Sequence, residues 1–235
     1  MKQLLGRRLF VKELVRGTMA VAVLGLGAAA CARRDDETLD GPWHRVSFGF
    51  VSAYILARDG RALIVDTGVA GSEGDIEAGL RAIGYDWSAV DHLILTHLHA
   101  DHIGSAETVM QRATRAAAYA GVADLAAIRS PRPVTPVGDG DEVFGLEIIE
   151  TPGHTPGHIS VLDPGNAVLV AGDAMNGAEG GVSGANPRFT ADMALANASI
   201  VKLAALQVET VYFGHGEPVL SGAGSLISDL AAGLR

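Results

Sequence analysis

The run from His97 to His102 constrains the fold most, because it gathers three histidines and one aspartate within six residues. It follows a short apolar segment, residues 92–96, that we expect to be a buried strand. Side chains alternate along an extended segment, so His97 and His99 would point the same way, and two converging neutral imidazoles make a good zinc site. Asp101 and His102 would reach a second point nearby. Packing has no use for this density of imidazoles, so we interpret the run as a metal site and not as a solvated loop.

A metal site at this run needs ligands from elsewhere in the chain. Three candidates stand beside glycines after other apolar segments, namely His154, Asp173 and His215. Glycine has no side chain, so backbone can approach a metal closely there. Any one of these residues alone would more often be structural, but together with the first run they indicate a single site.

The pattern of apolar residues and turn signals predicts one domain of mixed α/β (α+β) class. We expect strands at 46–50, 54–58, 62–66, 92–96, 143–150, 158–162, 167–171 and 210–213. Helices are expected at 75–83, 105–112, 190–206 with Thr190 as its cap, and 221–234. Sheet, helices, sheet and helices in this order favour two sheets with helices packed outside them.

Five short motifs resemble those of the metallo-β-lactamase superfamily and occur in the order typical of that family. They are Asp66-Thr67-Gly68, His97-Leu98-His99-Ala100-Asp101-His102, Gly153-His154-Thr155, Gly172-Asp173 and Gly214-His215-Gly216. The resemblance implies an αββα four-layer sandwich, the metallo-β-lactamase fold, with a site for two metal ions at one edge. It spans nearly all of the domain expected at 41–235.

The resemblance also implies roles for the motif residues. One zinc ion would be held by His97, His99 and His154, and a second by Asp101, His102 and His215, with Asp173 bridging the two. The cofactors implied are two Zn²⁺, with iron or manganese as open choices. For Asp66 two interpretations are open, a carboxylate behind the ligands that orients them or a simple cap at a strand end. For His158 they are a similar supporting role or packing.

The chemistry that the resemblance implies is zinc-dependent hydrolysis of an ester, thioester, lactone or related bond by a metal-bridging hydroxide. Asp101 would be catalytic, orienting the nucleophile and passing a proton. An iron-dependent sulfur dioxygenase of the same superfamily is one alternative. A non-catalytic exported metal-binding accessory protein is another. The sequence alone identifies no substrate-binding residue.

Asp173 narrows the branch of the family, because metallo-β-lactamases proper have Cys or Ser at this position. Aspartate there resembles the glyoxalase II-like and lactonase-like branches. Only residues 216–235 follow His215, so we expect no counterpart of the C-terminal helical domain with which glyoxalase II binds glutathione thioesters. Lactonases of the family often have a Tyr shortly after the bridging aspartate, whereas this chain has Ala174-Met175-Asn176 there.

The N-terminus predicts export. Residues 1–31 carry Arg7-Arg8 followed by Leu-Phe-Val-Lys and an apolar run, as in a twin-arginine signal. Cys31, the only cysteine, stands at the end of that run and favours a lipoprotein over ordinary cleavage. Residues 32–40 form an acidic linker. We therefore expect a periplasmic or cell-surface protein, either lipid-anchored at Cys31 or free.

The formal net charge of −9 argues against binding to nucleic acid or to anionic lipid. The partner expected is a small-molecule substrate, with membrane contact only through the signal or lipid anchor, and the oligomeric state is unknown. The Gly-rich segment 176–188 is interpreted as either a mobile lid or a plain connector. We expect His44 at the surface, His92 in the core or at a strand end, and Trp43, Phe48 and Phe50 in core packing rather than in a pocket.

Overall fold

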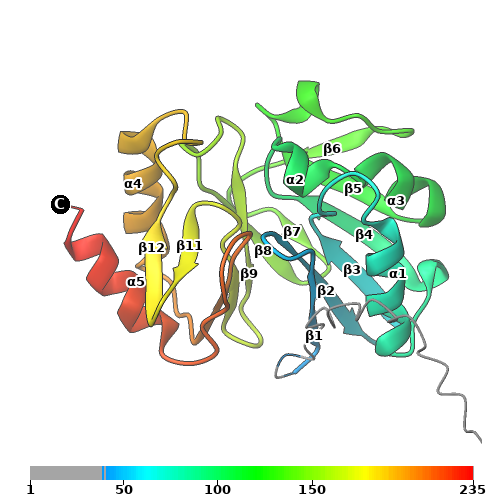
Figure 1. Cartoon of the computed structure of the whole chain (residues 1–235), viewed down its shortest axis with the longest axis horizontal. Coiled ribbons are helices and arrows are strands. Elements are labelled where there is room, and N and C mark those ends of the chain that lie inside the picture. Colours follow the sequence, from blue (N-terminus) through cyan, green and yellow to red (C-terminus); the bar gives the residue numbers. More distant parts are fainter. Residues whose placement is uncertain (1–38, 40, 235) are drawn as a thin grey trace, which may run out of the picture. The chain divides into compact units, whose positions relative to one another are not determined.

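The computed structural model describes Leu39 and residues 41–234. The expected export signal, and the expected linker apart from Leu39, lie outside the described residues. Two β-sheets form the centre of the domain, with helices on the outer face of each (Figure 1). Among the residues that the structure describes, no helix combines the length and the apolar character that crossing a bilayer requires.

The N-terminal half builds a six-stranded sheet in the order β1-β2-β3-β4-β5-β6. Its strands are β1 (Trp43–Ser47), β2 (Ser52–Arg58), β3 (Arg61–Val65), β4 (Val90–Leu95), β5 (Ala117–Gly121) and β6 (Val134–Val137). The first three strands pair antiparallel, whereas β3, β4, β5 and β6 pair parallel. Asp59 and Gly60 join β2 to β3 with φ angles of 53° and 74°, as a two-residue hairpin of right-handed twist requires.

The C-terminal half builds a five-stranded sheet in the order β13-β10-β9-β8-β7. Its strands are β7 (Glu142–Val143), β8 (Leu146–Glu150), β9 (Ile159–Asp163), β10 (Val168–Val170) and β13 (Thr210–Tyr212). A separate hairpin of β11 (Met175–Ala178) and β12 (Gly181–Gly184) follows β10. The predicted hairpin across residues 163–166 is confirmed by the pairing of β9 with β10.

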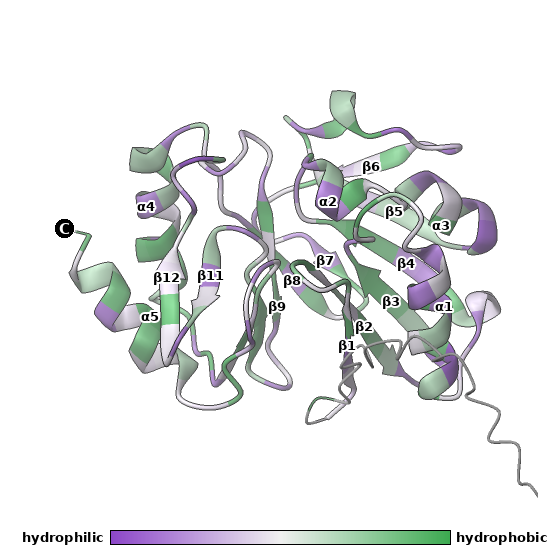
Figure 2. Cartoon of the chain, in the orientation of Figure 1, coloured by the Kyte–Doolittle hydropathy of each residue, from purple (hydrophilic) through white to green (hydrophobic). Residues whose placement is uncertain are grey.

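The helices form the two outer layers of the sandwich. They are α1 (Glu73–Ala82), α2 (Ala100–Ile103), α3 (Ala106–Arg112), α4 (Met193–Leu203) and α5 (Ala223–Ala232), with 3₁₀ turns at Trp87–Ala89 and Leu125–Ala127. Ile76 of α1 and Val109 of α3 pack on the first sheet, and Ile200 of α4 and Ile227 of α5 pack on the second. The strands β2, β3 and β4 are strongly hydrophobic, whereas hydrophilic residues are prominent on the helices α1 and α3 (Figure 2).

Alternation along the strands supplies the core between the two sheets. In β3, Leu63 and Val65 point toward the second sheet, whereas Ile64 points toward the helices. Val161 and Val170 meet them from the second sheet. The predicted αββα four-layer sandwich is therefore the observed architecture.

Several local predictions were wrong. The helix expected from 190 begins at Met193, and its cap is Asp192, which accepts a hydrogen bond from the backbone N–H of Leu195. The His-rich run is extended only as far as His99, because the helix α2 starts at Ala100. The segment expected as one strand at 143–150 is two strands, β7 and β8, separated by a turn. The strands β5, β6, β11 and β12 were not predicted.

His44 is buried, with 2% of its surface exposed, and not at the surface as expected. β1 begins at Trp43 rather than at residue 46, so His44 lies within the strand. Its ring lies beside Gly79 of α1, where an added Cβ would come within 3.3 Å of the imidazole. His92 is half-buried in β4, and its Nδ1 lies 3.3 Å from the Tyr119 hydroxyl, as expected for a histidine that packs rather than binds.

Candidate metal centre

The predicted ligands come together at one edge of the sandwich because the strands that precede them run in the same direction within each sheet. β3 and β4 are parallel, and β8, β10 and β13 share one direction in the second sheet. Their carboxyl ends therefore carry Asp66, the His97–His102 run, His154, Asp173 and His215 to one place. The structure brings all seven predicted ligands into three overlapping groups, and the donor atoms of each group lie within 4.8 Å of one another. Two of these groups are described next, and the third, formed by His97, His102 and Asp173, shares residues with both sides of the site.

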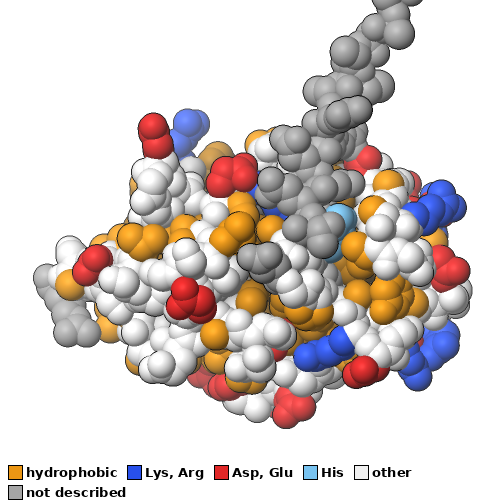
Figure 3. All heavy atoms as spheres, turned by 90° about the horizontal axis from the view of Figure 1, so that it is seen from below, with side chains coloured by type: hydrophobic (Ala, Val, Ile, Leu, Met, Phe, Trp, Pro, Cys, Tyr) orange, Lys and Arg blue, Asp and Glu red, His pale blue; other side chains and the backbone are white. Residues whose placement is uncertain are grey.

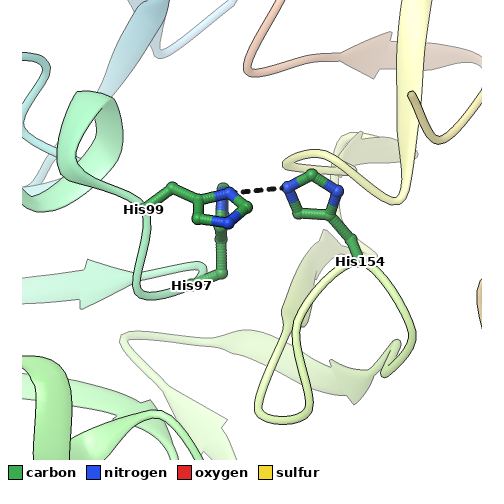
Figure 4. Close-up of side chains that lie close together, drawn as sticks. All are labelled: His97, His99 and His154. Atoms are coloured by element: carbon green, nitrogen blue, oxygen red, sulfur yellow. Dashed lines mark hydrogen bonds between the residues drawn. The ribbon is translucent and has the colours of Figure 1, made fainter. Parts of the chain in front are cut away.

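Three histidines form the first group (Figure 4). The Nδ1 atom of His99 lies 3.1 Å from Nε2 of His97 and 2.9 Å from Nε2 of His154. His97 and His154 are buried, while His99 is half-buried at the edge of a cavity. These nitrogens come from the two halves of the sandwich and converge on one point.

The second group contains Asp101, His102 and His215. Nε2 of His215 lies 3.4 Å from Nε2 of His102 and 3.3 Å from Oδ2 of Asp101. Asp173 stands between the two groups. Its Oδ2 lies 3.4 Å from His154 Nε2 and 3.3 Å from His215 Nε2, and its Oδ1 lies 3.4 Å from His102 Nε2.

These separations fit a bound cation. Ligand atoms placed about 2.0–2.1 Å from a tetrahedral zinc ion lie roughly 3.3 Å apart, close to the spacing in both groups. Oδ1 of Asp173 is buried without a hydrogen-bond partner among the described residues, and a buried carboxylate oxygen of this kind calls for a cation. Imidazole and carboxylate donors suit zinc, iron and manganese alike.

Hydrogen bonds behind the imidazoles aim their free nitrogens at the centre. His215 Nδ1 lies 2.7 Å from the Phe50 carbonyl, so this nitrogen carries the proton and Nε2 has the lone pair when metal is bound. His154 Nδ1 lies 3.2 Å from the Thr190 hydroxyl, which itself donates to the Asn186 carbonyl. Thr190 thus orients a ligand instead of capping a helix.

Asp66 supports both histidine groups from behind. Its Oδ2 lies 2.8 Å from His102 Nδ1 and accepts a 2.7 Å hydrogen bond from the Thr96 hydroxyl, whose oxygen lies 3.0 Å from His97 Nδ1. Its Oδ1 accepts from the Thr96 backbone N–H at 2.8 Å. Asp66 adopts φ 64°, a costly conformation for a residue other than glycine. Both sequence interpretations therefore describe it, since it caps a strand end and orients imidazoles.

His158 holds Asp173 through the backbone. Its Nε2 accepts a 3.0 Å hydrogen bond from the Asp173 N–H, and its Nδ1 lies 2.8 Å from the Thr151 hydroxyl. The ring is buried, and burial lowers its pKa to about 3. His158 is therefore neutral and fixes where the carboxylate of Asp173 stands, which agrees with a supporting role.

In the metal-free protein, the protonation states of the side chains at the centre leave a place for a positive charge. Burial keeps the pKa of His97 well below 6.5 and lowers that of His154 to about 4, so both offer lone pairs at neutral pH. Hydrogen bonding to Asp101 and then to Asp173 raises the pKa of His215 to about 10. Burial would raise the pKa of Asp173, but the hydrogen bond from His215 and the neighbouring imidazoles hold it at about 2. The protonated His215 thus supplies positive charge that bound metal would otherwise supply.

Asp124 belongs to this site although the sequence did not predict it. Its buried carboxylate accepts hydrogen bonds from the Leu98 N–H (3.0 Å), the Thr155 hydroxyl (2.6 Å) and the Gly157 N–H (2.8 Å). It therefore ties the loop of His97 and His99 to the loop of His154. A lone Asp in an irregular segment carries no motif that would have singled it out.

A cavity of about 500 Å³ opens beside the ligands, and His99, Asp101, Asp173 and His215 form part of its wall. Phe50 also lines it, contrary to the expectation that this residue packs in the core, whereas Trp43 is buried as expected. Asn176, Asn186 and Phe189 complete the wall together with Ala100. Much of the Gly-rich segment 176–188 next to it forms a paired hairpin, because β11 pairs with β12.

Comparison with known proteins identifies the same family that the sequence motifs resemble. A family model described as the metallo-beta-lactamase superfamily matches residues 46–215. The chain is 34% identical over 174 residues to a hydroxyacylglutathione hydrolase of Xylella fastidiosa (strain M12), covering 72% of this chain and 60% of that protein. It is 36% identical over 170 residues to a hydroxyacylglutathione hydrolase of Fuscovulum blasticum, covering 69% and 61%. The chain spans about 60% of the length of these relatives.

A crystal structure of a metallo-beta-lactamase family protein from Thermus thermophilus has the same fold. It superimposes with a TM-score of 0.65 at 22% sequence identity, over 82% of this chain and 79% of that protein. At this identity the likeness concerns the fold alone.

Proposed function

Since the chain belongs to the metallo-β-lactamase superfamily, we propose that it is a hydrolase that holds two divalent metal ions and cleaves an ester, thioester or lactone. The observation that carries the proposal is the convergence of donor atoms from both halves of the sandwich within 4.8 Å, with Asp173 between the two groups. Zinc is the ion we propose first, with iron or manganese as alternatives.

The residues present fit such ions, as the spacing of the nitrogens and the unpartnered oxygen of Asp173 indicate. His97, His99 and His154 would hold one ion, Asp101, His102 and His215 the other, and Asp173 both. When bound, such ions lower the pKa of water to about 7 and polarise a carbonyl.

Asp101 is the residue of the chain best placed to handle a proton. Its carboxylate is partly exposed and lines the cavity, where a substrate would stand. In the metal-free protein the hydrogen bond from His215 lowers the pKa of Asp101, so its carboxylate is ionised at neutral pH. We propose that Asp101 receives a proton from the attacking water and delivers it toward the leaving group.

A thioester is the bond we propose first. The two relatives described above are hydroxyacylglutathione hydrolases, and Asp173 resembles the aspartate of the glyoxalase II-like branch. The proposal is tested on protein loaded with zinc, iron or manganese, by assaying thioester, lactone, phosphoester and β-lactam hydrolysis together with oxygen consumption. Thioester or lactone cleavage is expected. Oxygen uptake without hydrolysis would favour a sulfur dioxygenase, and metal binding without any turnover would favour an accessory protein.

Export remains a proposal, supported by Arg7-Arg8 and the apolar run that follows. A fusion of residues 1–40 to a reporter is expected to leave the cytoplasm, and replacement of Arg7 and Arg8 by Lys is expected to retain it there. A reporter that stays inside with the native residues would contradict export.

Basic and acidic side chains are interspersed on the face of the domain drawn in Figure 3.

A further inference from the structure

Two exposed phenylalanines stand in the wall of the cavity beside the metal ligands. Phe50 is 61% exposed and Phe189 is 60% exposed. Phe50 lies in the turn between β1 and β2, and Phe189 lies between β12 and α4, so each half of the sandwich contributes one ring. Two large aromatic side chains that stay in water next to a ligand cluster gain nothing from burial of their apolar surface. A bound ligand that covers them would bury that surface.

The polar groups of this wall, apart from the metal ligands, are uncharged. Asn186 accepts a 3.1 Å hydrogen bond from the Arg188 N–H through Oδ1, and this leaves its amide N–H groups for a ligand. Asn176 donates to the Gly184 carbonyl at 3.0 Å. Among the described residues, no Lys or Arg lines the cavity. In the metal-loaded protein, in which Nε2 of His215 has a lone pair, positive charge at the cavity would come from the bound ions.

Arg188 is the cation nearest to this wall in sequence, and it does not line the cavity. Its guanidinium carbon lies 5.8 Å from the centre of the Phe189 ring. In this structure the guanidinium therefore packs over the Phe189 ring and is not part of the cavity wall.

We propose that the substrate is an uncharged ester, thioester or lactone that carries an aromatic or long alkyl group, and that Phe50 and Phe189 are the residues that select it. The proposal rests on the proposed hydrolase function. Phe50 is fixed in position by His215. The two rings stack with their centroids 6.0 Å apart and their planes at 13°, and the Phe50 carbonyl oxygen accepts a hydrogen bond from the same imidazole. An apolar group laid against the two rings would be buried next to the reacting bond.

An anionic substrate would gain less in this cavity. Removing a carboxylate from water without a partner is costly, and the walls beyond the ligands supply no cation among the described residues. A glutathione thioester carries two carboxylates on its leaving group. The structure therefore favours a neutral leaving group over glutathione, although the relatives described above are hydroxyacylglutathione hydrolases.

The test compares two thioesters with the same phenylacetyl group, one of N-acetylcysteamine and one of glutathione. The neutral thioester is expected to have a kcat/KM at least about tenfold higher. The corresponding phenylethyl thioethers, which cannot be hydrolysed, are compared by calorimetry and should show the same order of Kd. Equal or better use of the glutathione compounds would overturn the proposal.

Variants locate the effect. Phe50→Ala and Phe189→Ala are each expected to lower kcat/KM for the phenylacetyl thioester about tenfold, and that for the acetyl thioester less than about threefold, because only the larger group reaches the rings. Leu220→Ala is the control, since Leu220 is 46% exposed and does not line the cavity. Equal losses on both thioesters would overturn the assignment of the two rings.

The two proposals can fail separately. If both thioesters are cleaved without preference, the substrate class is wrong and the hydrolase proposal stands. If neither is cleaved, the proposed function fails with respect to thioesters, and the thioether affinities still decide whether the cavity prefers the neutral apolar ligand.

Discussion

The Asp124 carboxylate accepts a 2.6 Å hydrogen bond from the Thr155 hydroxyl, although the two residues follow strands of different sheets. The same carboxylate also holds the Leu98 N–H at 3.0 Å. His99 and His154, whose nitrogens lie 2.9 Å apart, are the neighbours of Leu98 and Thr155. The spacing of the first ligand group therefore depends on a carboxylate that contacts none of its nitrogens in the described structure.

Asp124→Ala is expected to weaken metal binding and hydrolysis by about 10- to 100-fold, as for other residues that support ligands from behind. Loss of the carboxylate leaves three donors without their acceptor and frees one loop from the other. Asp163→Ala is the matched control, because Asp163 is also a buried carboxylate but bonds Trp43 and Asn166. Metal affinity measured by chelator competition should fall only in the first variant. Equal losses in both would reduce Asp124 to a general contribution to stability.

Gly214→Ala is expected to destroy the second ligand group. A Cβ at this position would lie 2.2 Å from Oδ1 of Asp173 and 2.4 Å from Cε1 of His102, both buried. Gly184→Ala places its Cβ 3.6 Å from Ile200 Cδ1, an ordinary contact, and serves as the control. Circular dichroism should show both variants folded, while bound metal per chain drops only for Gly214→Ala. Full metal loading of that variant would contradict the described geometry.

His158 makes the stability of the metal-free protein depend on pH. Burial lowers its pKa in the folded state to about 3, below the unfolded value of about 6.5, so its contribution is complete above pH 6.5 and is lost as pH falls toward 3. This one group should reduce the free energy of unfolding by about 2 kcal/mol between pH 7 and pH 5. Urea unfolding of His158→Gln should show a shallower decline than the wild type, in which His97 and His154 also contribute. Parallel declines would mean that His158 is protonated in the folded protein.

The sequence predicts most of this fold because the strands that build its core are strongly apolar and separated by clear turns. β2 and β3 alternate around Asp59 and Gly60, and the helix expected at 75–83 ends where Gly84 allows φ 81°. Two strands of the first sheet escape prediction for physical reasons. β5 is built from Ala, Tyr and Gly, which have weak strand signals apart from Tyr119. β6 contains Pro136, which is tolerated because β6 is an edge strand.

The hairpin of β11 and β12 could not be read from its glycines, because contacts far along the chain hold it. The Gly177 N–H donates to the His215 carbonyl at 2.9 Å, and a Cβ at Gly177 would lie 2.4 Å from the Glu217 carbonyl oxygen. A sequence pattern carries no signal for such close backbone approach. The same limit applies to Asp124, whose three donors come from two separate loops.

The side chains that converge at this edge were predictable, since a metal site demands particular side chains at strand ends. The residues that aim the ligands were only partly so. Thr190 has the sequence of a helix cap, yet its hydroxyl faces His154 and the cap is Asp192 two residues later. Phe50 has the composition of a core residue, yet it lines the cavity. The sequence cannot separate a helix cap from a residue that orients a ligand, or a core residue from one that lines a cavity. In each case the same side chain stands at the boundary of a helix or strand.

We propose that Asp173 and the two ligand groups form one two-metal hydrolytic centre, and a zinc titration tests this most directly. Metal-free protein is titrated with Zn²⁺ while bound metal and thioester hydrolysis are followed together, for the wild type and for Asp173→Ala. Wild-type hydrolysis is expected to be absent without metal and to reach its maximum at about two equivalents. Asp173→Ala should bind less zinc and stay inactive. Hydrolysis that persists in the metal-free protein, or a variant that binds and cleaves like the wild type, would contradict a two-metal centre.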